Sequence, residues 1–349
     1  MREDPDGELM TNRPEAQLSG RAHARPLIER YRERLPVGGA TPVVSLGEGS
    51  TPLLAAPRLS ARLGCEIWLK WEGSNPTGSY KDRGMTVAVS KALEEGARAV
   101  ICASTGNTAA SAAAYAARAG IAAVVLQPRG AVAGGKLAQT RALGARVLEV
   151  DGSFDDALAA ARELASRGTH TLVNSLNPYR REGQKTAVFE IVEELGEAPD
   201  AFYLPYGGGG NTVSYALGLA ELGASARLVS AQAADRAHTL ASAIRIGVPA
   251  HAAAVAATGA EVATVSDELI VAAWRSLALE EGLFCEPSSA AGLAALEADP
   301  PRGARVVLTI TGHGLKDPDA AAAYAPPPVV VAADADAIAE ISLREISRD

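Results

Sequence analysis

Two kinds of apolar segment alternate along this chain, and their alternation limits its fold more than any other feature. Short, nearly uninterrupted apolar runs, such as 98–104 and 122–128, alternate with longer Ala- and Leu-rich segments that end at glycine. Runs of the first kind are typical of strands buried on both faces, and segments of the second kind are typical of helices. The pattern therefore predicts an α/β fold in which helices cover both faces of parallel sheet.

The boundaries of these elements follow from the same pattern and from the helix start and stop residues. Strands are predicted at 66–72, 98–104, 122–128, 146–150, 170–175, 201–206, 227–231 and 304–311. Helices are predicted at 79–95, 107–118, 153–166 and 181–195, with one more ending at 143 and one more beginning near 211. The tail at 326–341 predicts one strand and a helix, and Ser153 is predicted to be a helix N-cap.

Charge and cysteine content restrict the class of function. The chain carries 33 Lys and Arg against 41 Asp and Glu, and its net charge of -8 argues against a nucleic-acid binder, which needs a basic face. No purely apolar run is long enough to cross a membrane, and the N-terminal residues lack the apolar segment of a secretory signal. The 3 cysteines form no CxxC or Cys/His cluster, which indicates a reducing, cytoplasmic environment and no metal site.

Ligands of parallel sheets bind beyond the carboxyl ends of the strands, and the unusual loops of this chain follow predicted strands. The loop at 73–85 places Lys81 in the first turn of a helix. A cation is disfavoured there, because a helix N-terminus is already positive. Lys81 therefore either reaches solvent or loses its charge for a reason, such as a Schiff base with an aldehyde.

The loop at 103–111, ASTGNTAAS, combines hydroxyls, an amide and free backbone N–H groups at a helix start. Its polar side chains include Ser104, Thr105, Asn107 and Thr108. This composition is suited to a carboxylate or a phosphate, although ordinary helix capping would also account for it.

Four consecutive glycines, 207–210, lie between a predicted strand and a helix and would let the backbone approach an anion closely. No Lys follows them as in a P-loop, and the next strand lacks the acid of a dinucleotide site, so a single phosphate group is the expected ligand. A flexible turn is the alternative. The loop TGHGLKDP at 311–318 offers the hydroxyl of Thr311, whereas His313 has no partner acid nearby and is predicted to be structural.

Taken together, these loops resemble the fold type II pyridoxal-phosphate enzymes and, within that class, the threonine synthase family. The resemblance covers about Leu27 to Pro318 and is carried by NPTGSYKDRGM, STGNT, LGEGSTPLL, EPSSAAG, NPYRREGQKT and TGHGLKDP. It implies two open, mostly parallel twisted sheets with helices on both faces. It also implies a flexible N-terminal arm at 1–25, a large cofactor-binding domain formed by 26–84 and 172–349, and a small substrate-side domain at 85–171.

The resemblance also implies a role for each candidate residue. Lys81 would carry pyridoxal 5'-phosphate and, once the substrate releases it, would transfer protons. Asn107 would contact the phenolic oxygen of the cofactor ring, and Thr311 its pyridine nitrogen. The cofactor phosphate would be held by Gly207, Gly208, Gly209, Gly210 and Asn211. The substrate carboxylate would contact Ser104, Thr105 and Thr108, and the substrate phosphate would contact Asn174, Ser175 and Arg180.

The implied enzyme is a cytoplasmic homodimer that converts O-phosphohomoserine and water to L-threonine and phosphate, by γ-elimination followed by β-addition of water. Two departures, PYGGGGN and a short segment between Leu222 and Ala241, leave open a paralogous lyase or a threonine/serine dehydratase acting on another amino acid. The motif at 174–180 argues against a dehydratase, which has no substrate phosphate to hold. A non-catalytic ligand sensor is a further alternative, but a sensor does not require the amine of Lys81.

Overall fold

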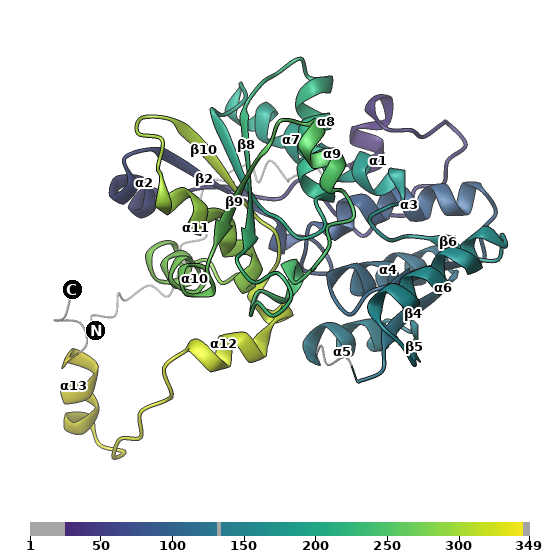
Figure 1. The fold of residues 1–349 in the computed structure, drawn as a ribbon. Coiled ribbons are helices and arrows are strands. Elements are labelled where there is room, and N and C mark those ends of the chain that lie inside the picture. The colour runs from purple at the N-terminus through teal and green to yellow at the C-terminus, as the bar shows by residue number, and fades with distance from the viewer. Residues whose placement is uncertain (1–24, 131–133, 345–349) are drawn as a thin grey trace, which may run out of the picture.

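The computed structural model describes residues 25–130 and 134–344 and contains two sheets (Figure 1). The six-stranded sheet has the order β1 (Leu53–Ala55), β2 (Glu66–Trp71), β10 (Arg305–Ile310), β7 (Ala201–Pro205), β8 (Arg227–Ala233) and β9 (Glu261–Val265). The four-stranded sheet has the order β5 (Arg146–Val150), β4 (Ala122–Pro128), β3 (Ala99–Ala103) and β6 (Thr171–Leu172). All neighbouring strands are parallel except β1 and β2. The predicted α/β fold with two mostly parallel sheets is confirmed.

Helices cover both faces of the six-stranded sheet. One face packs against α2 (Pro57–Leu63), α10 (Asp267–Glu281) and α11 (Ala291–Ala298), and the other against α7 (Pro178–Leu195) and α8 (Gly210–Glu221). Strand β10 contributes to both cores, since Val306 and Leu308 lie in the first and Val307 in the second. Burial on both faces explains why the strand reads as a continuous apolar run.

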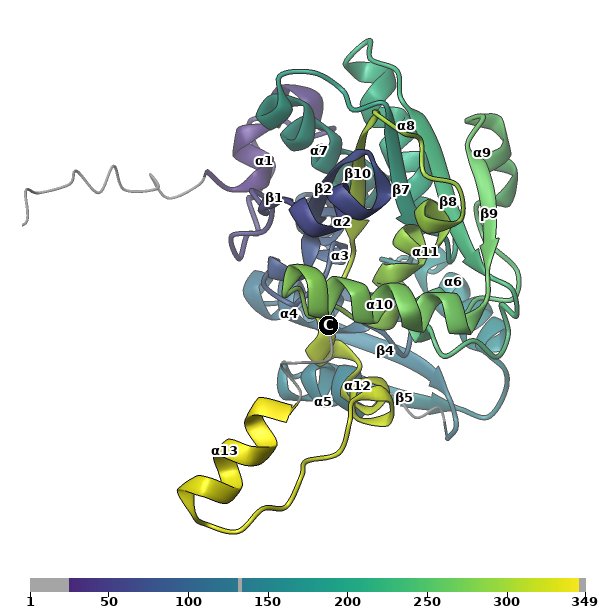
Figure 2. The same cartoon turned by 90° about the vertical axis from the view of Figure 1, so that its left-hand side faces the viewer.

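The four-stranded sheet is covered in the same way. The residues of α3 (Lys81–Glu94) and α4 (Asn107–Ala119) pack on one face, and those of α6 (Phe154–Ser166) on the other. Helix α5 (Gly134–Ala142) precedes β5. Figure 2 shows β4 and β5 at one end of the molecule, with β8 and β9 at the other. Helix α3 lies between the two sheets, because it also packs closely against α7.

The crossing of α3 and α7 leaves no room for side chains between the two backbones. A Cβ atom at Gly183 would lie 1.9 Å from the carbonyl oxygen of Arg83, and one at Gly84 would lie 2.5 Å from that of Arg180. Glycine at both positions therefore lets the helices touch. The contact holds the N-terminus of α3, which begins at Lys81, beside the first turns of α7.

Most of the predicted elements are confirmed, and the exceptions lie at edges and in the tail. The edge strands β1 and β9 were not predicted, and neither were the helices α2, α10 and α11, which cover one face of the six-stranded sheet. The strand predicted at 170–175 is reduced to β6. The strand predicted in the tail at 326–341 is wrong, because no strand lies among these residues, whereas the predicted helix is present as α13 (Ala335–Arg344). Helix α12 (Pro318–Tyr324) precedes the tail. Residues 1–24 of the predicted arm lie outside the described residues, and the domain boundaries stay predictions.

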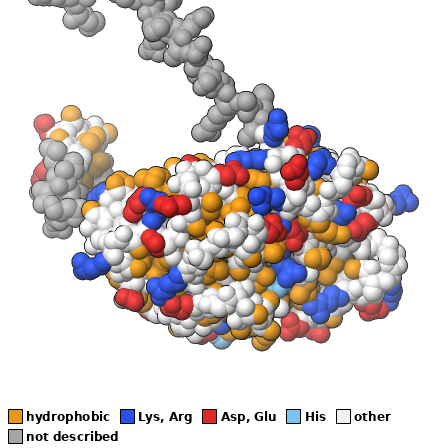
Figure 3. Space-filling view, turned by 90° about the horizontal axis from the view of Figure 1, so that it is seen from above, with side chains coloured by type: hydrophobic (Ala, Val, Ile, Leu, Met, Phe, Trp, Pro, Cys, Tyr) orange, Lys and Arg blue, Asp and Glu red, His pale blue; other side chains and the backbone are white. Residues whose placement is uncertain are grey.

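The surface carries charges of both signs. On the face seen in Figure 3, basic and acidic side chains are interspersed among apolar ones. Among the described helices, none combines the length and apolar character that crossing a membrane requires.

Candidate functional site

The predicted site residues follow the carboxyl ends of strands from both sheets. Lys81 comes after β2, Asn107 after β3, the glycine loop 207–210 after β7 and Thr311 after β10. The backbone N–H of Tyr80 donates to the carbonyl oxygen of Thr311 at 3.0 Å, so two of these loops are directly joined. The structure thus brings the loops to the side of the sheets where ligands of parallel sheets bind.

Lys81 is the first residue of α3 and is half-buried. Its Nζ donates to the hydroxyl oxygen of Tyr80 at 2.6 Å and lies 4.4 Å from the centre of the Tyr80 ring. The amine is therefore held at the helix start and faces another side chain of the same loop. The Lys81 side chain therefore does not simply extend into solvent, which was one of the two alternatives that the sequence left open.

A buried ion-pair network fixes α3 immediately behind Lys81. The Arg83 guanidinium bonds the carboxylates of Glu72 and Glu190, both at 2.8 Å or less, and the Lys70 ammonium lies 2.8 Å from Glu190. All these side chains are almost completely buried. Although burial opposes it, the charges of Arg83 and Lys70 lower the pKa of Glu190 well below its usual range. The network joins β2, α3 and α7, so it restricts the position of α3.

The glycine loop is tightly packed and precedes a helix with free N–H groups. Gly209 has a φ of +88°, and a Cβ atom there would lie 2.8 Å from Val255. Helix α8 begins at Gly210, so its first backbone N–H groups have no partner within the helix. The buried side-chain nitrogen of Asn211 has no hydrogen-bond partner among the described residues. Donors of this kind at a helix N-terminus are suited to an anionic oxygen.

Two residues that the sequence analysis missed surround this loop. The His251 backbone N–H donates to the carbonyl oxygen of Gly208 at 3.0 Å, and its ring nitrogen lies 3.1 Å from the carbonyl oxygen of Ser175. Burial and the nearby charges of Arg181 and Lys81 lower the pKa of the His251 ring. The Arg236 guanidinium donates to the carbonyl oxygen of Gly207 at 2.7 Å. Neither residue belongs to a motif, so the sequence carried no signal for them.

Asn107 contacts a third residue without a predicted role, Glu286. The Asn107 side-chain nitrogen donates to the Glu286 carboxylate at 2.9 Å, while its side-chain oxygen is buried and has no partner among the described residues. Glu286 lies against Gly312, because a Cβ atom at Gly312 would be 2.4 Å from its Oε1 atom. The neighbouring Thr311 hydroxyl lies 2.9 Å from that of Ser289. Asn107 and the loop of Thr311 are thus connected through one buried carboxylate.

Arg180 has an incomplete set of partners. The side chain is 1% exposed, and one terminal nitrogen donates to the carbonyl oxygen of Val173 at 2.7 Å. The other terminal nitrogen and Nε have no partner among the described residues, and burial lowers the pKa of this guanidinium. Buried polar groups are normally satisfied, so two open donors on one guanidinium indicate a site for an anion.

Arg180 forms no ion pair with Glu182 or Glu190 among the described residues. Glu182 bonds Lys185 at 2.5 Å, and Glu190 belongs to the Arg83 network. The Nε atom and one terminal nitrogen of Arg180 therefore have no partner among the described residues.

The other residues predicted to bind substrate differ in whether their polar atoms already form hydrogen bonds within the protein. The Asn174 amide bonds both backbone groups of Ala103, at 3.0 and 2.8 Å, and so shapes the loop that follows β3. The Ser104 hydroxyl accepts from the backbone N–H of Gly106 at 3.1 Å. The half-buried residues Thr105, Thr108 and Ser175 lie in the same group of loops. Their contacts with a substrate stay predictions.

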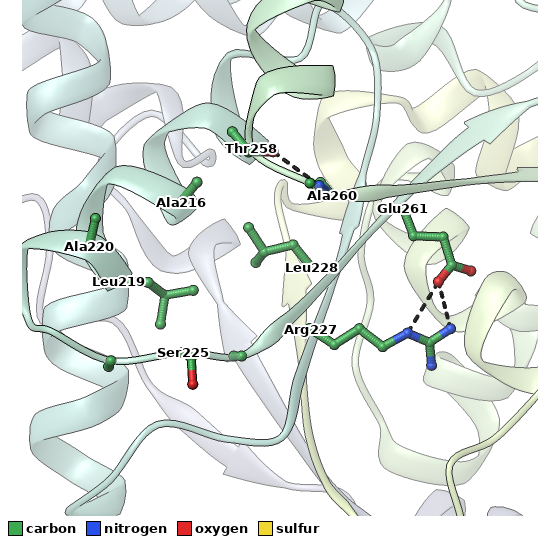
Figure 4. A pocket seen from close by; sticks show the side chains of 12 residues that line it. Ala216, Leu219, Ala220, Ser225, Arg227, Leu228, Thr258, Ala260 and Glu261 are labelled. Carbon is green, nitrogen blue, oxygen red and sulfur yellow. Dashed lines mark hydrogen bonds and ion pairs between the residues drawn. The ribbon is translucent and has the colours of Figure 1, made fainter.

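A pocket of about 320 Å³ lies far from these loops, between the end of α8 and the starts of β8 and β9 (Figure 4). Its lining includes Leu219, Leu228 and Ala260, and Arg227 at its edge bonds Glu261. The pocket lies at the amino ends of two parallel strands, the side opposite to that used by ligands of such sheets. It is therefore separate from the candidate site.

Comparisons with known proteins agree with this geometry. Residues 44–312 match the family described as pyridoxal-phosphate dependent enzyme. Threonine synthase from Synechocystis sp. is 50% identical over 88% of this chain and 87% of its own length. Threonine synthase from Mycobacterium leprae is 50% identical over 90% of this chain and 95% of its own length. The enzyme of the same name from Methanocaldococcus jannaschii is 42% identical over 91% and 87%.

Solved structures share the fold at lower identity. Maize serine racemase covers 85% of this chain and 92% of its own with a TM-score of 0.69 and 22% identity. Threonine deaminase isoform 2 from Solanum lycopersicum, in its processed form, covers 75% of this chain and 79% of its own with a TM-score of 0.68 and 24% identity. These two likenesses concern the fold alone.

Proposed function

We propose that this chain, which belongs to the threonine synthases within the pyridoxal-phosphate dependent enzyme family, converts O-phosphohomoserine and water to L-threonine and phosphate. The reaction class is that of a carbon–oxygen lyase acting on phosphates. The substrate is a small molecule, and its phosphate leaves from Cγ before water adds at Cβ.

The residues of the site fit pyridoxal 5'-phosphate. Asn107 and Asn211 each keep a buried polar atom without a partner among the described residues, and the glycine loop excludes side chains next to a helix N-terminus. Lys81 would hold the cofactor, Asn107 its phenolic oxygen, 207–211 its phosphate and Thr311 its pyridine nitrogen. When bound, the cofactor supplies an electron sink for charge that develops at the substrate carbons.

The chain's own residues perform the remaining steps. The amine of Lys81, once free, removes the proton at Cα and then moves protons at Cβ. Ser104, Thr105 and Thr108 orient the substrate through its carboxylate. Arg180 holds the phosphate group before and after it leaves, because a guanidinium binds phosphate oxygens through two parallel hydrogen bonds.

The open donors of Arg180 support this substrate over its alternatives. The Nε atom lies 2.7 Å from where a Cβ atom of Gly84 would be, only three residues beyond Lys81. A dehydratase acting on serine or threonine has no substrate phosphate for such a group. A buried guanidinium without an anion carries an unfavourable desolvation energy, so a phosphorylated substrate accounts better for its presence.

Replacement of Arg180 tests the proposal. We expect Arg180→Ala to lower kcat/KM for O-phosphohomoserine at least tenfold, since a hydrogen bond to a charged group contributes roughly 1.5–3 kcal/mol. Inorganic phosphate should inhibit the wild type competitively and inhibit the variant poorly. Arg180→Lys, which keeps the charge without the planar fork, should recover only part of the loss.

The exposed Arg162→Ala is the matched control and should behave as the wild type. Elimination from unphosphorylated serine or threonine should hardly change in Arg180→Ala. If Arg180→Ala lowers kcat/KM equally for phosphorylated and unphosphorylated substrates, Arg180 is structural. If the wild type prefers the unphosphorylated substrate, the chain is a paralogous dehydratase or lyase.

We further propose that the enzyme is a cytoplasmic homodimer. The family resemblance supports the dimer, and the three cysteines, all buried and free, support a reducing compartment. Light scattering on the purified protein at several concentrations would test the dimer directly.

A further inference from the structure

Tyr80 has no role in the mechanism above, yet its hydroxyl accepts the one side-chain hydrogen bond that the Lys81 amine makes among the described residues. The distance from Nζ to the tyrosine hydroxyl oxygen is 2.6 Å, and the amine also lies 4.4 Å from the ring centre. Neighbouring residues at the start of a helix normally direct their side chains apart. The long lysine side chain must therefore bend back over the ring to make this contact.

The backbone of Tyr80 is fixed on both sides, so the hydroxyl is presented at a defined place. Its N–H donates to the carbonyl oxygen of Thr311 at 3.0 Å, and its carbonyl oxygen accepts from Arg83 at 3.3 Å. Ser79, the residue before it, forms an isolated bridge with Gly312. Tyr80 is thus attached to the loop expected to face the cofactor and to the helix that carries Lys81.

The charged groups around this pair make a defined position for the amine important. Burial and the charges of Arg181 and Lys81 lower the pKa of the His251 ring, so a second positive group lies near the amine. The Tyr80 hydroxyl and ring are the side-chain groups that contact this amine among the described residues. A phenol can accept a hydrogen bond from an ammonium and donate one to a neutral amine.

We propose that the Tyr80 hydroxyl is the resting position of the Lys81 amine whenever that amine is free, both before the cofactor is loaded and after the substrate has displaced it. Tyr80 is then a positioning residue that keeps Nζ near the reacting carbons and in a defined orientation. The inference rests on the proposed function, because it assigns Lys81 the reactions described there. It adds a residue that controls how fast the free amine can react.

The phenylalanine variant isolates the hydroxyl, because Tyr80→Phe keeps the ring beneath the amine and removes only the hydrogen bond. We expect cofactor-free Tyr80→Phe to load pyridoxal 5'-phosphate about tenfold more slowly than the cofactor-free wild type, as measured by the growth of the visible absorbance band. In the loaded enzyme, kcat for O-phosphohomoserine should fall by a similar factor, while KM should stay within about twofold.

Tyr179→Phe is the matched control, since its hydroxyl bonds Glu95 on the exposed surface at 3.2 Å. This variant should load and turn over as the wild type. The melting temperatures of both variants should match that of the wild type, which separates positioning of the amine from a loss of folding.

The possible failures are distinguishable. If Tyr80→Phe loads cofactor and turns over at wild-type rates, the positioning role is overturned and the proposed function is untouched. An increase in KM with unchanged kcat and loading rate would also overturn it, because Tyr80 would then act on substrate binding. If the wild type shows no visible band or does not use O-phosphohomoserine, the proposed function itself fails.

Discussion

At the scale of single residues, the position after Lys81 shows how burial controls charge in this loop. Asp82 is fully buried and accepts hydrogen bonds from the backbone and hydroxyl of Thr77, both at 2.7 Å, and from Ser111 at 2.6 Å. Burial raises the pKa of the Asp82 carboxyl to about 6, although these hydrogen bonds oppose the shift. The Asp82 side chain thus connects the loop before α3 to α4. Because it is buried there, its carboxyl ionises less readily than an exposed one.

The raised pKa predicts a dependence of stability on pH. Asp82 binds its proton more tightly in the folded protein than in the unfolded chain, whose pKa is near 3.8. Its contribution is therefore most favourable below about pH 4, falls between pH 4 and pH 6, and stays constant above. Relative to Asp82→Asn, the wild type should lose about 2 kcal/mol of unfolding free energy between pH 4 and pH 7.

Urea unfolding at each pH would measure this difference. Asp151→Asn, which removes a largely exposed carboxylate, should show no comparable dependence. Parallel curves for the wild type and Asp82→Asn would contradict the prediction.

At the scale of elements, the crossing of α3 and α7 decides where the lysine lies. Glycine lowers the stability of an isolated helix. At this crossing the two glycines nevertheless favour the fold, because they allow the backbones of α3 and α7 to touch. Helix α7 also has clear local signals, since Asn177 caps it, Pro178 follows, and Gly196 ends it. The bounds of α7 could therefore be predicted approximately from the sequence, whereas its contact with α3 could not.

A methyl group at this crossing should be strongly destabilising. Gly183→Ala would place Cβ 1.9 Å from a backbone carbonyl oxygen, so a helix must move. We expect a loss of about 1–3 kcal/mol or more in the free energy of unfolding, in spite of the better helix propensity of alanine. The displaced α3 should also lower the rate of cofactor loading at Lys81.

Gly247→Ala is the matched control, because no atom lies within 4 Å of its added Cβ and it should leave both quantities unchanged. Denaturant unfolding and the loading assay on both variants would measure the effects. An unaltered Gly183→Ala protein would show that the helices can separate without consequence.

At the scale of the whole molecule, a cluster of buried charged side chains connects the part that contains the four-stranded sheet to the part that contains the six-stranded sheet. Lys136 on α5 lies 3.3 Å from Glu286 and 3.7 Å from Asp317, and donates to the Ser242 hydroxyl at 2.8 Å. The three partners lie in segments that connect elements of the six-stranded sheet and its covering helices, while α5 packs with the four-stranded sheet. The ion pairs therefore hold the two parts of the molecule together across the loops that carry Asn107 and Thr311.

Removal of the cation should leave a buried carboxylate uncompensated. Glu286 is 1% exposed, so Lys136→Met should reduce the free energy of unfolding by about 3–5 kcal/mol. Arg129→Met, which breaks an exposed ion pair with Asp151, should change it by less than about 1 kcal/mol. The double variant Lys136→Met/Glu286→Gln should recover part of the loss, because the buried charge is gone.

Thermal and denaturant unfolding would measure the three variants, and limited proteolysis would report whether the two layers separate. An equal effect of Lys136→Met and Arg129→Met would show that the buried cluster does not hold the layers together.

The sequence by itself determined the features that depend on near neighbours along the chain. The apolar runs of the inner strands, the Ser153 cap that accepts from Asp156 at 3.2 Å, and the loops after β2, β3, β7 and β10 all follow from residues a few positions apart. Parallel strands place such loops on one side of a sheet, so the sequence predicts that these loops lie close together. The edge strands β1 and β9 were not predicted from the sequence, because short, half-exposed strands lack a continuous apolar pattern.

Only the tertiary structure decided which distant side chains meet. Glu286 lies 179 positions from Asn107 yet receives its hydrogen bond, and His251 lies 76 positions from Ser175. The open donors of Arg180 and the contact between Tyr80 and Lys81 likewise depend on how α3, α7 and the loop of Thr311 pack. Such contacts are set by the sum of many packing energies over the whole core, which no local pattern of residues encodes.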